Sequence, residues 1–251
     1  MEYIKVTAEN LAQEHLCCAI TEKKGETAIK DKKQWLDEAM KDGLVFLKAA
    51  IRGKVFIEYM PAETAWNPIK ADHYFHINCL WVSGQYKGQG LSNDLLQACI
   101  EDAKEQNKEG ITILSSKKKM PYLCDPRFLK YKGFMTADTW GPYELLYLPL
   151  KENATIPTFV KNEEAAKNNP QGYTLYYTNQ CPFTSKYAKT FKEEMDKAGI
   201  PCQLIHVQSS EQARLIPAPV TNYALFQGAD YLGNEILSEK KIAALIEKYA
   251  G

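Results

Sequence analysis

The segment of this sequence best suited to chemistry is a glycine-bearing turn at residues 85–90 (Gln-Tyr-Lys-Gly-Gln-Gly), between an apolar run and a long amphipathic stretch. Glycines let successive backbone N–H groups converge, and a following helix adds unpaired amides and the positive end of its dipole. Such a turn can hold a pyrophosphate, with Lys87 as a cation at its rim. A strand-to-helix connection that needs glycine only for its shape would carry the same residues, so both interpretations stay open. The dinucleotide-binding fingerprint is not met, because Asn93 stands in its third glycine position.

A second candidate for chemistry is Cys181, within residues 179–184 (Asn-Gln-Cys-Pro-Phe-Thr), where a strand-like run meets a helix-like one. A helix N-terminus stabilises a thiolate and so makes a cysteine there reactive. Thr184 stands where a second cysteine would complete a Cys-x-x-Cys pair, which excludes dithiol exchange within the motif. Monothiol chemistry, substrate binding and a purely structural role remain.

Composition narrows the class of protein. The 251 residues allow two domains, and 31 basic side chains balance 31 acidic ones, so no global charge favours nucleic acid or acidic membranes. The only short cationic run, three lysines at residues 117–119, is interpreted as a solvated loop. No apolar stretch approaches the roughly 20 residues needed to span a bilayer, and the first residues lack the pattern of a secretory signal.

Cysteine and histidine usage predicts a cytoplasmic protein without a structural metal. Seven cysteines, at positions 17, 18, 79, 99, 124, 181 and 202, are odd in number and scattered, which is typical of reduced thiols. The four histidines show no metal-ligand spacing with cysteine pairs. His73, His76 and Cys79 are close in sequence, but on a strand His76 would face away from the other two, so we interpret them as structural.

The elements that must position the turn follow a βααβββαβαβ order, a mixed α/β arrangement. Strands are expected at residues 3–6, 44–49, 55–60, 73–82, 111–114 and 143–148, and helices at 9–20, 32–41, 91–106 and up to 132. Residues 151–171 lose apolar periodicity and end in turn-forming residues, so we place a linker there, between domains at 1–150 and 172–251. The second domain is expected to read strand (173–178), helix (185–197), strand (203–207), a hairpin near 227–228 and a final helix capped by Ser238, with Ile242, Leu245, Ile246 and Tyr249 on one face.

On these residues the first 150 positions resemble the GNAT acetyltransferases. Gln85-x-x-Gly88-x-Gly90 matches that family's Q/R-x-x-G-x-G/A signature, and residues 128–134 (Phe-Leu-Lys-Tyr-Lys-Gly-Phe) resemble the helix end and Gly-Phe that close its fold. The resemblance implies the acyl-CoA N-acyltransferase fold and acetyl-CoA as co-substrate. The residues that it places at the pyrophosphate and the pantetheine arm are Leu80, Trp81, Val82, Gln85, Tyr86, Lys87, Gly88, Gln89, Gly90, Leu91 and Ser92.

The catalytic residues are less clearly marked. Many GNAT enzymes protonate the leaving thiolate with a tyrosine, but the matching position here is Leu129, and Tyr131 lies two residues later. Glu58, mid-strand between two apolar residues of the same face, is the candidate base. Asn78 is a candidate for binding the substrate or the thioester carbonyl. Ordinary packing roles for Tyr131, Glu58 and Asn78 fit the sequence as well.

The second domain resembles a thioredoxin-like fold, with Cys181 at the first strand-to-helix turn and Pro219 as the candidate cis-proline facing it. More narrowly, residues 55–61, 78–84 and 226–228 resemble the GNAT proteins that carry a YoaP-like C-terminal domain. The resemblance implies an N-acetyltransferase acting on an amine of a small molecule or peptide, and GNAT domains often form homodimers. A non-catalytic acyl-CoA sensor and a monothiol protein acting through Cys181 are the alternatives.

Overall fold

A computed structural model of the chain describes residues 1–16, 20 and 26–250, of which 249 and 250 are described by their backbone alone. The chain forms two compact units. The first contains Met1–Ile20, Lys33–Ala65 and Ile69–Val160, and the second contains Thr21–Lys32, Trp66–Pro68 and Lys161–Gly251. Two short segments of the N-terminal half therefore belong to the second unit, which a linear division of the sequence does not anticipate. Cys17 and Cys18 lie outside the described residues.

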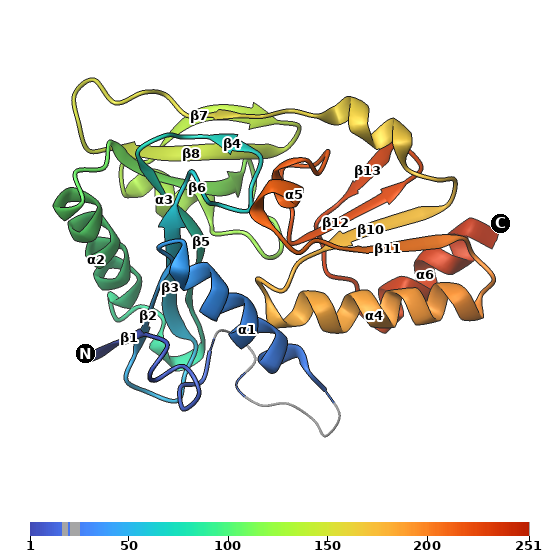
Figure 1. Ribbon diagram of the computed structural model, residues 1–251, viewed down its shortest axis with the longest axis horizontal. Helices are drawn as coiled ribbons and strands as arrows, with labels where there is room; N and C mark the ends of the chain where they lie inside the picture. The colour runs from blue at the N-terminus through green and yellow to red at the C-terminus, as the bar shows by residue number, and fades with distance from the viewer. Residues whose placement is uncertain (17–19, 21–25, 251) are drawn as a thin grey trace. The chain divides into compact units, whose positions relative to one another are not determined.

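The first unit is built on a seven-stranded mixed sheet (Figure 1). Its order is β1 (Tyr3–Val6), β2 (Val45–Ala49), β3 (Val55–Pro61), β5 (Tyr74–Val82), β6 (Gly110–Ser116), β8 (Tyr143–Pro149) and β7 (Met135–Trp140). Neighbours are antiparallel except β5 and β6, which run parallel. A separate pair joins β4 (Ile69–Lys70) to β9 (Thr158–Phe159). The central β5–β6 pair is thus the only place in these described strands where two carboxyl ends of the large sheet meet at one edge.

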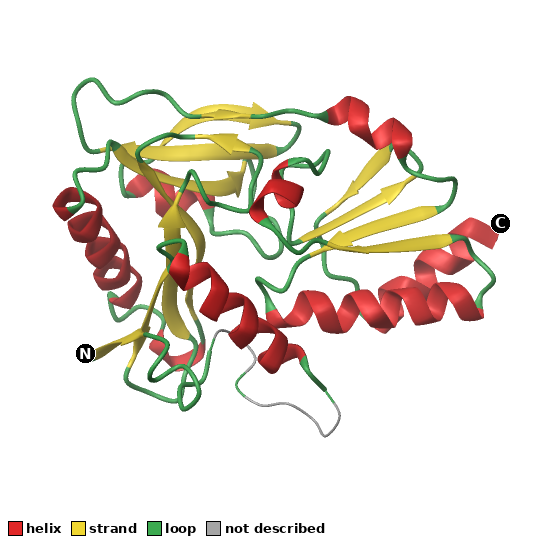
Figure 2. Ribbon diagram, in the orientation of Figure 1, coloured by secondary structure: helices red, strands yellow, loops and turns green. Residues whose placement is uncertain are grey.

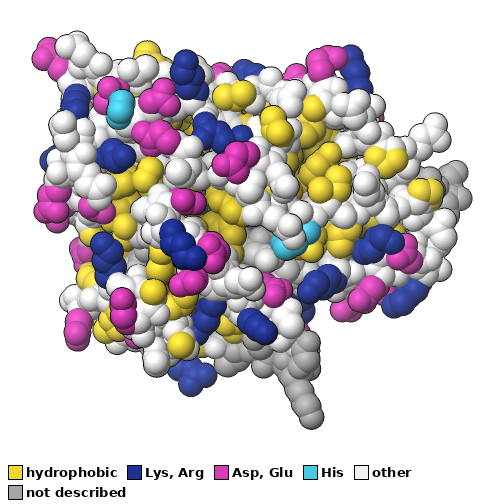
Figure 3. Space-filling model, viewed as in Figure 1, with side chains coloured by type: hydrophobic (Ala, Val, Ile, Leu, Met, Phe, Trp, Pro, Cys, Tyr) yellow, Lys and Arg dark blue, Asp and Glu magenta, His cyan; other side chains and the backbone are white. Residues whose placement is uncertain are grey.

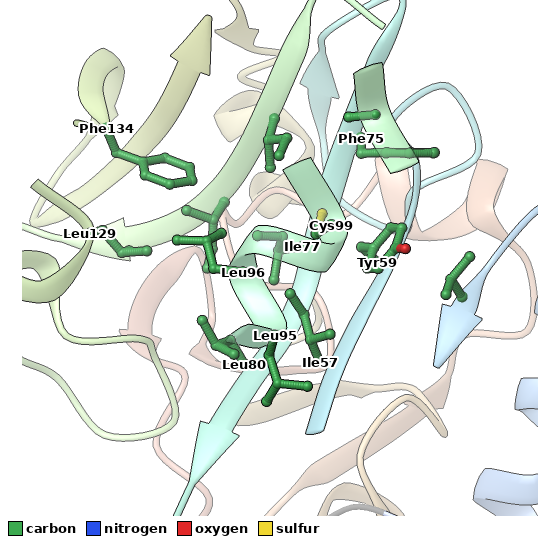
Figure 4. Packing of buried hydrophobic residues seen from close by; sticks show 14 of the residues in the cluster. Ile57, Tyr59, Phe75, Ile77, Leu80, Leu95, Leu96, Cys99, Leu129 and Phe134 are labelled. Carbon is green, nitrogen blue, oxygen red and sulfur yellow. The ribbon is translucent and has the colours of Figure 1, made fainter. Parts of the chain in front are cut away.

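One helix covers the centre of this sheet. The helix α2 (Leu91–Glu105) packs on β3, β5 and β6, because its apolar residues recur at helical spacing and meet the inward residues of those strands. Figure 4 shows the resulting core, in which Leu95, Leu96 and Cys99 lie among strand residues such as Ile57 and Ile77. Tyr59 fixes the helix as well, since its hydroxyl donates to Asp102 Oδ2 at 2.7 Å. The other helices are α1 (Ala28–Lys41), whose first five residues belong to the second unit, and α3 (Pro126–Tyr131).

Two expectations for the first unit were wrong. The helix expected from residue 9 is absent from the described part of that segment, which forms turns at residues 8–13. Asn10 explains this, because its side chain accepts from the Thr7 amide at 2.9 Å and donates to the Lys5 carbonyl at 3.1 Å, and so competes with helical hydrogen bonds. The edge strand β7 was not expected at all, since only Trp140 of its six residues is buried and a bulge interrupts its alternation.

The second unit has a four-stranded sheet in the order β11 (Cys202–His206), β10 (Tyr173–Tyr177), β12 (Tyr223–Gln227) and β13 (Asp230–Gly233). β10 and β11 are parallel and the other pairs antiparallel. Figure 2 shows α4 (Pro182–Lys197) and α6 (Glu239–Ala250) side by side, and they pack against each other over a core that includes Leu175, Phe191 and Ile242. The short α5 (Ser210–Arg214) follows β11, and a 3-10 segment at Glu163–Asn168 precedes β10.

The N-terminal segment of the second unit is held by ion pairs to α4. Lys186 Nζ lies 2.8 Å from Glu26 Oε1, and Lys189 Nζ lies 3.9 Å from Asp31 Oδ2. The Thr221 hydroxyl donates to the Trp66 carbonyl. These long-range contacts join residues that are far apart in sequence, which is why the segment could not be assigned from local patterns.

Positive and negative side chains are mixed across the face seen in Figure 3, in keeping with the equal numbers of basic and acidic residues.

None of the helices in the described part of the chain is long and apolar enough to cross a membrane.

Candidate functional site

The central parallel pair opens into a gap. β5 and β6 are in register from Tyr74↔Gly110 to Ile77↔Ile113, yet β5 continues to Val82 and β6 to Ser116. At a rise of about 3.3 Å per residue, β5 extends roughly 16 Å and β6 roughly 10 Å past their last pair. Among the described strands, β6 therefore leaves the backbone N–H and C=O groups of Leu80 and Val82 on its side without a neighbouring strand, and these groups can pair with an extended ligand instead.

The divergence begins at a β-bulge. On the other side of β5, Tyr59 pairs with Ile77 and Glu58 pairs with Cys79, so Asn78 is the extra residue. The bulge shifts the alternation of side chains, and Ile77 and Leu80 consequently pack in the same core although they are three residues apart. Bulges re-aim side chains beside functional sites, and here the side chain that is re-aimed is Asn78.

The structure brings Asn78 and Glu58 together. Asn78 Nδ2 donates to Glu58 Oε1 at 3.2 Å and lies 3.5 Å from Met60 Sδ. Asn78 Oδ1 is buried and has no hydrogen-bond partner among the described residues. Glu58 is only 2% exposed. A buried acceptor left unsatisfied costs about 1–3 kcal/mol, so Asn78 Oδ1 is suited to receive an N–H or O–H from a ligand.

A neutral histidine lies on the same strand. Burial lowers the pKa of His76 to about 3. Its Nδ1 is 3.0 Å from Thr112 Oγ1, and the Thr112 hydroxyl donates to the Phe75 carbonyl at 3.3 Å. The tautomer with its hydrogen on Nδ1 lets Thr112 accept from His76 while it donates to the carbonyl, and leaves the lone pair on Nε2. We interpreted His76 as structural from sequence and did not single out Thr112; no spacing signal distinguished them from ordinary strand residues.

The glycine turn lies at the end of β5. Gly84, Gly88 and Gly90 have φ of +61°, +77° and +81°, which side chains rarely adopt, and a Cβ on any of them would meet no atom within 4 Å. In the described part of the chain, the amides of residues 88–92 donate to no backbone carbonyl or side chain. The glycines are therefore required by backbone shape, and the space beside their α-carbons is open.

The base of this turn is fixed to the β2–β3 hairpin. The Ser83 amide donates to the Lys54 carbonyl at 3.0 Å, and the Tyr86 ring lies against the Gly53 backbone, where an added Cβ would be 2.5 Å from Tyr86 Cε2. Gln89 Nε2 donates to the Gln85 carbonyl at 2.7 Å. Lys87 is exposed within the turn, and Trp81, before it, is 40% exposed. Leu91, the first residue of α2, is buried, and Ser92 is half-buried. The turn is thus anchored at its base to the hairpin.

The structure does not bring Tyr131 to Glu58 and Asn78. Its side chain is 83% exposed and its ring lies 5.1 Å from Lys132 Nζ, whereas Leu129 is fully buried in the core (Figure 4). Cys124, in the same region, is half-buried, and burial raises the pKa of its thiol to about 12. The helix α3 therefore turns its tyrosine outward and its leucine inward.

In the second unit, Cys181 is the N-cap of α4, with Pro182 at the first helical position. The helix begins three residues earlier than expected. Thr184 is buried and donates to the carbonyls of Thr178 and Cys181, so it binds the turn together where a second cysteine would stand. The described residues contain no cis peptide bond, which makes the expected cis conformation at Pro219 wrong.

Comparison with known proteins agrees with this arrangement. The model of the family described as "Acetyltransferase (GNAT) family" matches residues 9–119, and that described as "YoaP-like" matches residues 201–243. The first unit is an acetyltransferase domain with the acyl-CoA N-acyltransferase fold. The chain belongs to the GNAT acetyltransferase family.

A full-length relative carries the same two parts of the sequence. The "Uncharacterized N-acetyltransferase YoaP" of Bacillus subtilis (strain 168) is 40% identical over 251 residues, which is 100% of both chains. Among solved structures, a GNAT acetyltransferase from Staphylococcus aureus Mu50 is 16% identical, with a TM-score of 0.41, and covers 60% of this chain and 99% of its own. The PaiA N-acetyltransferase of Thermoplasma acidophilum, solved with coenzyme A, is 16% identical with a TM-score of 0.40, and covers 59% and 99%.

Proposed function

We propose that the chain transfers the acetyl group of acetyl-CoA to an amine. The observation that carries this proposal is the continuity of three features along β5: an unpaired acceptor at the bulge, an open strand edge at Leu80 and Val82, and a glycine turn with uncommitted amides. The free edge at Leu80 and Val82 suits the amides of the pantetheine arm. Within the turn, the amides of residues 88–92 suit the pyrophosphate, because in the described part of the chain they donate to no other group and the glycines at 88 and 90 carry no Cβ.

The chemistry requires three things at the bulge. A neutral amine must attack the thioester carbonyl, the developing oxyanion must be stabilised, and the departing CoA thiolate must receive a proton. Asn78 Oδ1 is placed to accept an N–H from the amine and so to aim its lone pair at the carbonyl. Glu58, which contacts Asn78, is the proposed proton acceptor, directly or through water. We assign the general acid to no residue, because Leu129 is buried and Tyr131 faces outward.

The position of Leu129 also favours a second candidate, an acyl-CoA-binding protein without turnover. Both functions require the same cofactor-binding turn, so binding alone does not separate them. They differ in whether CoA is released when an amine is added.

For the second unit we propose a thioredoxin-like arrangement. Its support is the order β11-β10-β12-β13, with a parallel pair joined through α4 and Cys181 at the N-terminus of that helix. A monothiol role for Cys181 is the function that this arrangement would allow.

The test is a calorimetric titration of acetyl-CoA into the full chain, with ATP as the control ligand, followed by a CoA-release assay on a panel of amines. Micromolar binding of acetyl-CoA but not ATP, with amine-dependent release of CoA, is the expected result. Binding without release on any amine would favour the acyl-CoA-binding protein, and absence of binding would refute both.

Residue roles are tested with Asn78→Ala and, as the matched control, Asn93→Ala on the exposed face of α2. We expect Asn78→Ala to lower kcat at least tenfold, with little change in acetyl-CoA affinity. The reason is that Asn78 is proposed to accept a hydrogen bond from the amine and makes no contact with the phosphates. The control should leave kcat within twofold of the wild type. Equal kcat in the two variants would remove Asn78 from the mechanism.

A further inference from the structure

The lysine run at residues 117–119 lies at the same edge of the sheet as the glycine turn. It follows the end of β6 directly, as the turn follows the end of β5, and these two strands are parallel. Because their carboxyl ends point the same way and diverge beyond Ile77↔Ile113, the turn and the lysine run stand on opposite sides of the gap. A ligand that enters the gap from this edge passes between them.

The backbone of the run is fixed, although its side chains are exposed. The Lys117 amide donates to the Pro142 carbonyl at 2.9 Å, and the Ser116 hydroxyl donates to the Lys118 carbonyl at 2.6 Å. Ser116 itself is fully buried. These two hydrogen bonds hold the backbone of Lys117 and Lys118 at the end of β6, and the three lysine side chains extend from there into solvent.

These cations have no anionic partner of their own. In the described ranges, the side chains of residues 117–119 and of Lys87 form no ion pair within 4 Å. Lys119 does act electrostatically on Asp125, but that carboxylate is already paired with Arg127 at 3.1 Å, and this pair is the main cause of its lowered pKa. The gap is therefore flanked by uncompensated positive charge on the β6 side as well as by the amides of the turn.

We propose that the lysines at residues 117–119 bind the dianionic 3′-phosphate on the ribose of coenzyme A. This proposal rests on the proposed function, because it takes the pyrophosphate to be at the turn. With the pyrophosphate there, the nucleotide end of the ligand lies beyond the carboxyl edge of the sheet, where the lysines are. Lys87 on the opposite side completes a cationic rim.

The size of the effect follows from exposed ion pairs. One such pair contributes up to about 1 kcal/mol, which corresponds to roughly fivefold in affinity, and two lysines on one phosphate give roughly a tenfold preference or somewhat more. The preference should shrink when ionic strength rises from about 0.05 M to about 0.5 M, since screening of exposed charges strengthens over that range.

The experiment compares coenzyme A with 3′-dephospho-coenzyme A by calorimetry, using the full chain. The variant replaces all three lysines (Lys117→Gln, Lys118→Gln and Lys119→Gln). A matched control removes three exposed positive charges elsewhere in the first unit (Lys5→Gln, Lys70→Gln and Lys104→Gln). None of these three lysines belongs to the turn, to the hairpin that anchors it, or to the segment after β6. Thermal unfolding of each variant establishes that it is folded.

The wild type and the control are expected to prefer coenzyme A roughly tenfold, and the lysine variant less than twofold, with its affinity for 3′-dephospho-coenzyme A unchanged. A wild type that binds both compounds equally well would overturn the 3′-phosphate site while leaving the coenzyme A site intact. So would a preference that the lysine variant keeps or that the control loses. A wild type that binds neither compound would refute the proposed function itself, and this site with it.

Discussion

Gly88→Ala is the substitution that tests the anion-binding turn most directly. Gly88 has φ +77°, and a Cβ added there would meet no protein atom within 4 Å. The methyl group therefore causes no clash within the protein. It enters only open space beside the turn, where we place the pyrophosphate.

Two separate costs are expected. An alanine held in the left-handed region costs about 1–2 kcal/mol of folding stability, whatever binds there. In addition, the methyl group, or the backbone shift that avoids it, should remove one charge-assisted hydrogen bond from an amide to the phosphate, worth about 1.5–3 kcal/mol. The second cost corresponds to about 10- to 150-fold weaker binding of acetyl-CoA.

The control that separates these costs is Gly133→Ala, in the turn after α3. Gly133 has φ +89°, and its Cβ would make only an ordinary contact, at 3.5 Å from Leu148 Cδ1. Both variants should lose a similar 1–2 kcal/mol in urea unfolding, because both place alanine in the left-handed region. Only Gly88→Ala should lose acetyl-CoA affinity in the calorimeter. If it bound acetyl-CoA within twofold of the wild type, the turn would be a structural connection and our reasoning would be refuted.

Three further outcomes are expected. Tyr59→Phe should lower the free energy of unfolding by about 1–2 kcal/mol in urea, because it deletes the 2.7 Å hydrogen bond to Asp102 that holds α2 on the sheet; an unchanged midpoint would contradict this. His76 has a folded pKa of about 3 against 6.5 when unfolded, so the unfolded chain binds more protons between these values, and stability should fall as the pH drops from about 6.5 towards 3. His76→Gln should flatten that part of the urea-derived stability profile, and an equally steep profile would argue against a buried neutral imidazole. At pH 8 iodoacetamide should modify Cys181 before Cys202, because Cys181 lies at a helix N-terminus and burial raises the pKa of Cys202 to about 11; peptide mapping that finds equal rates would count against a reactive Cys181.

The turn could be predicted from sequence because glycine spacing reports backbone shape directly. The backbone has positive φ at Gly88 and Gly90, and few residues other than glycine adopt it readily. The shape of the turn is therefore visible in the residue types. The same holds for α2, whose apolar residues recur with helical period, and for β5, which is a continuous apolar run.

The bulge could not be predicted in this way. Before Asn78 the inward residues of β5 follow a period of two, and after it they are shifted by one, so a strict alternation assigns the later residues to the wrong face. The bulge shows in the sequence only as the three-residue spacing between Ile77 and Leu80, which pack in one core. A short apolar strand has too few positions for that spacing to be distinguished from chance. The edge strand β7 could not be predicted from sequence for a related reason, because few of its residues are buried and they show no alternation of apolar and polar residues.

The position of the bulge limits which ligand the site can take. Pairing between β5 and β6 ends at Ile77, and the bulge at Asn78 begins there, so the proposed position of the reacting end coincides with the start of the gap. The turn begins after Val82, and the intervening residues of β5 separate the proposed phosphate position from Asn78 by about 16 Å. A ligand that reaches both must therefore carry a long, extended arm with its own amides between its phosphates and its reacting carbonyl. Acetyl-CoA has such an arm in pantetheine, whereas a nucleoside triphosphate bound at the same turn would end far short of Asn78 and Glu58.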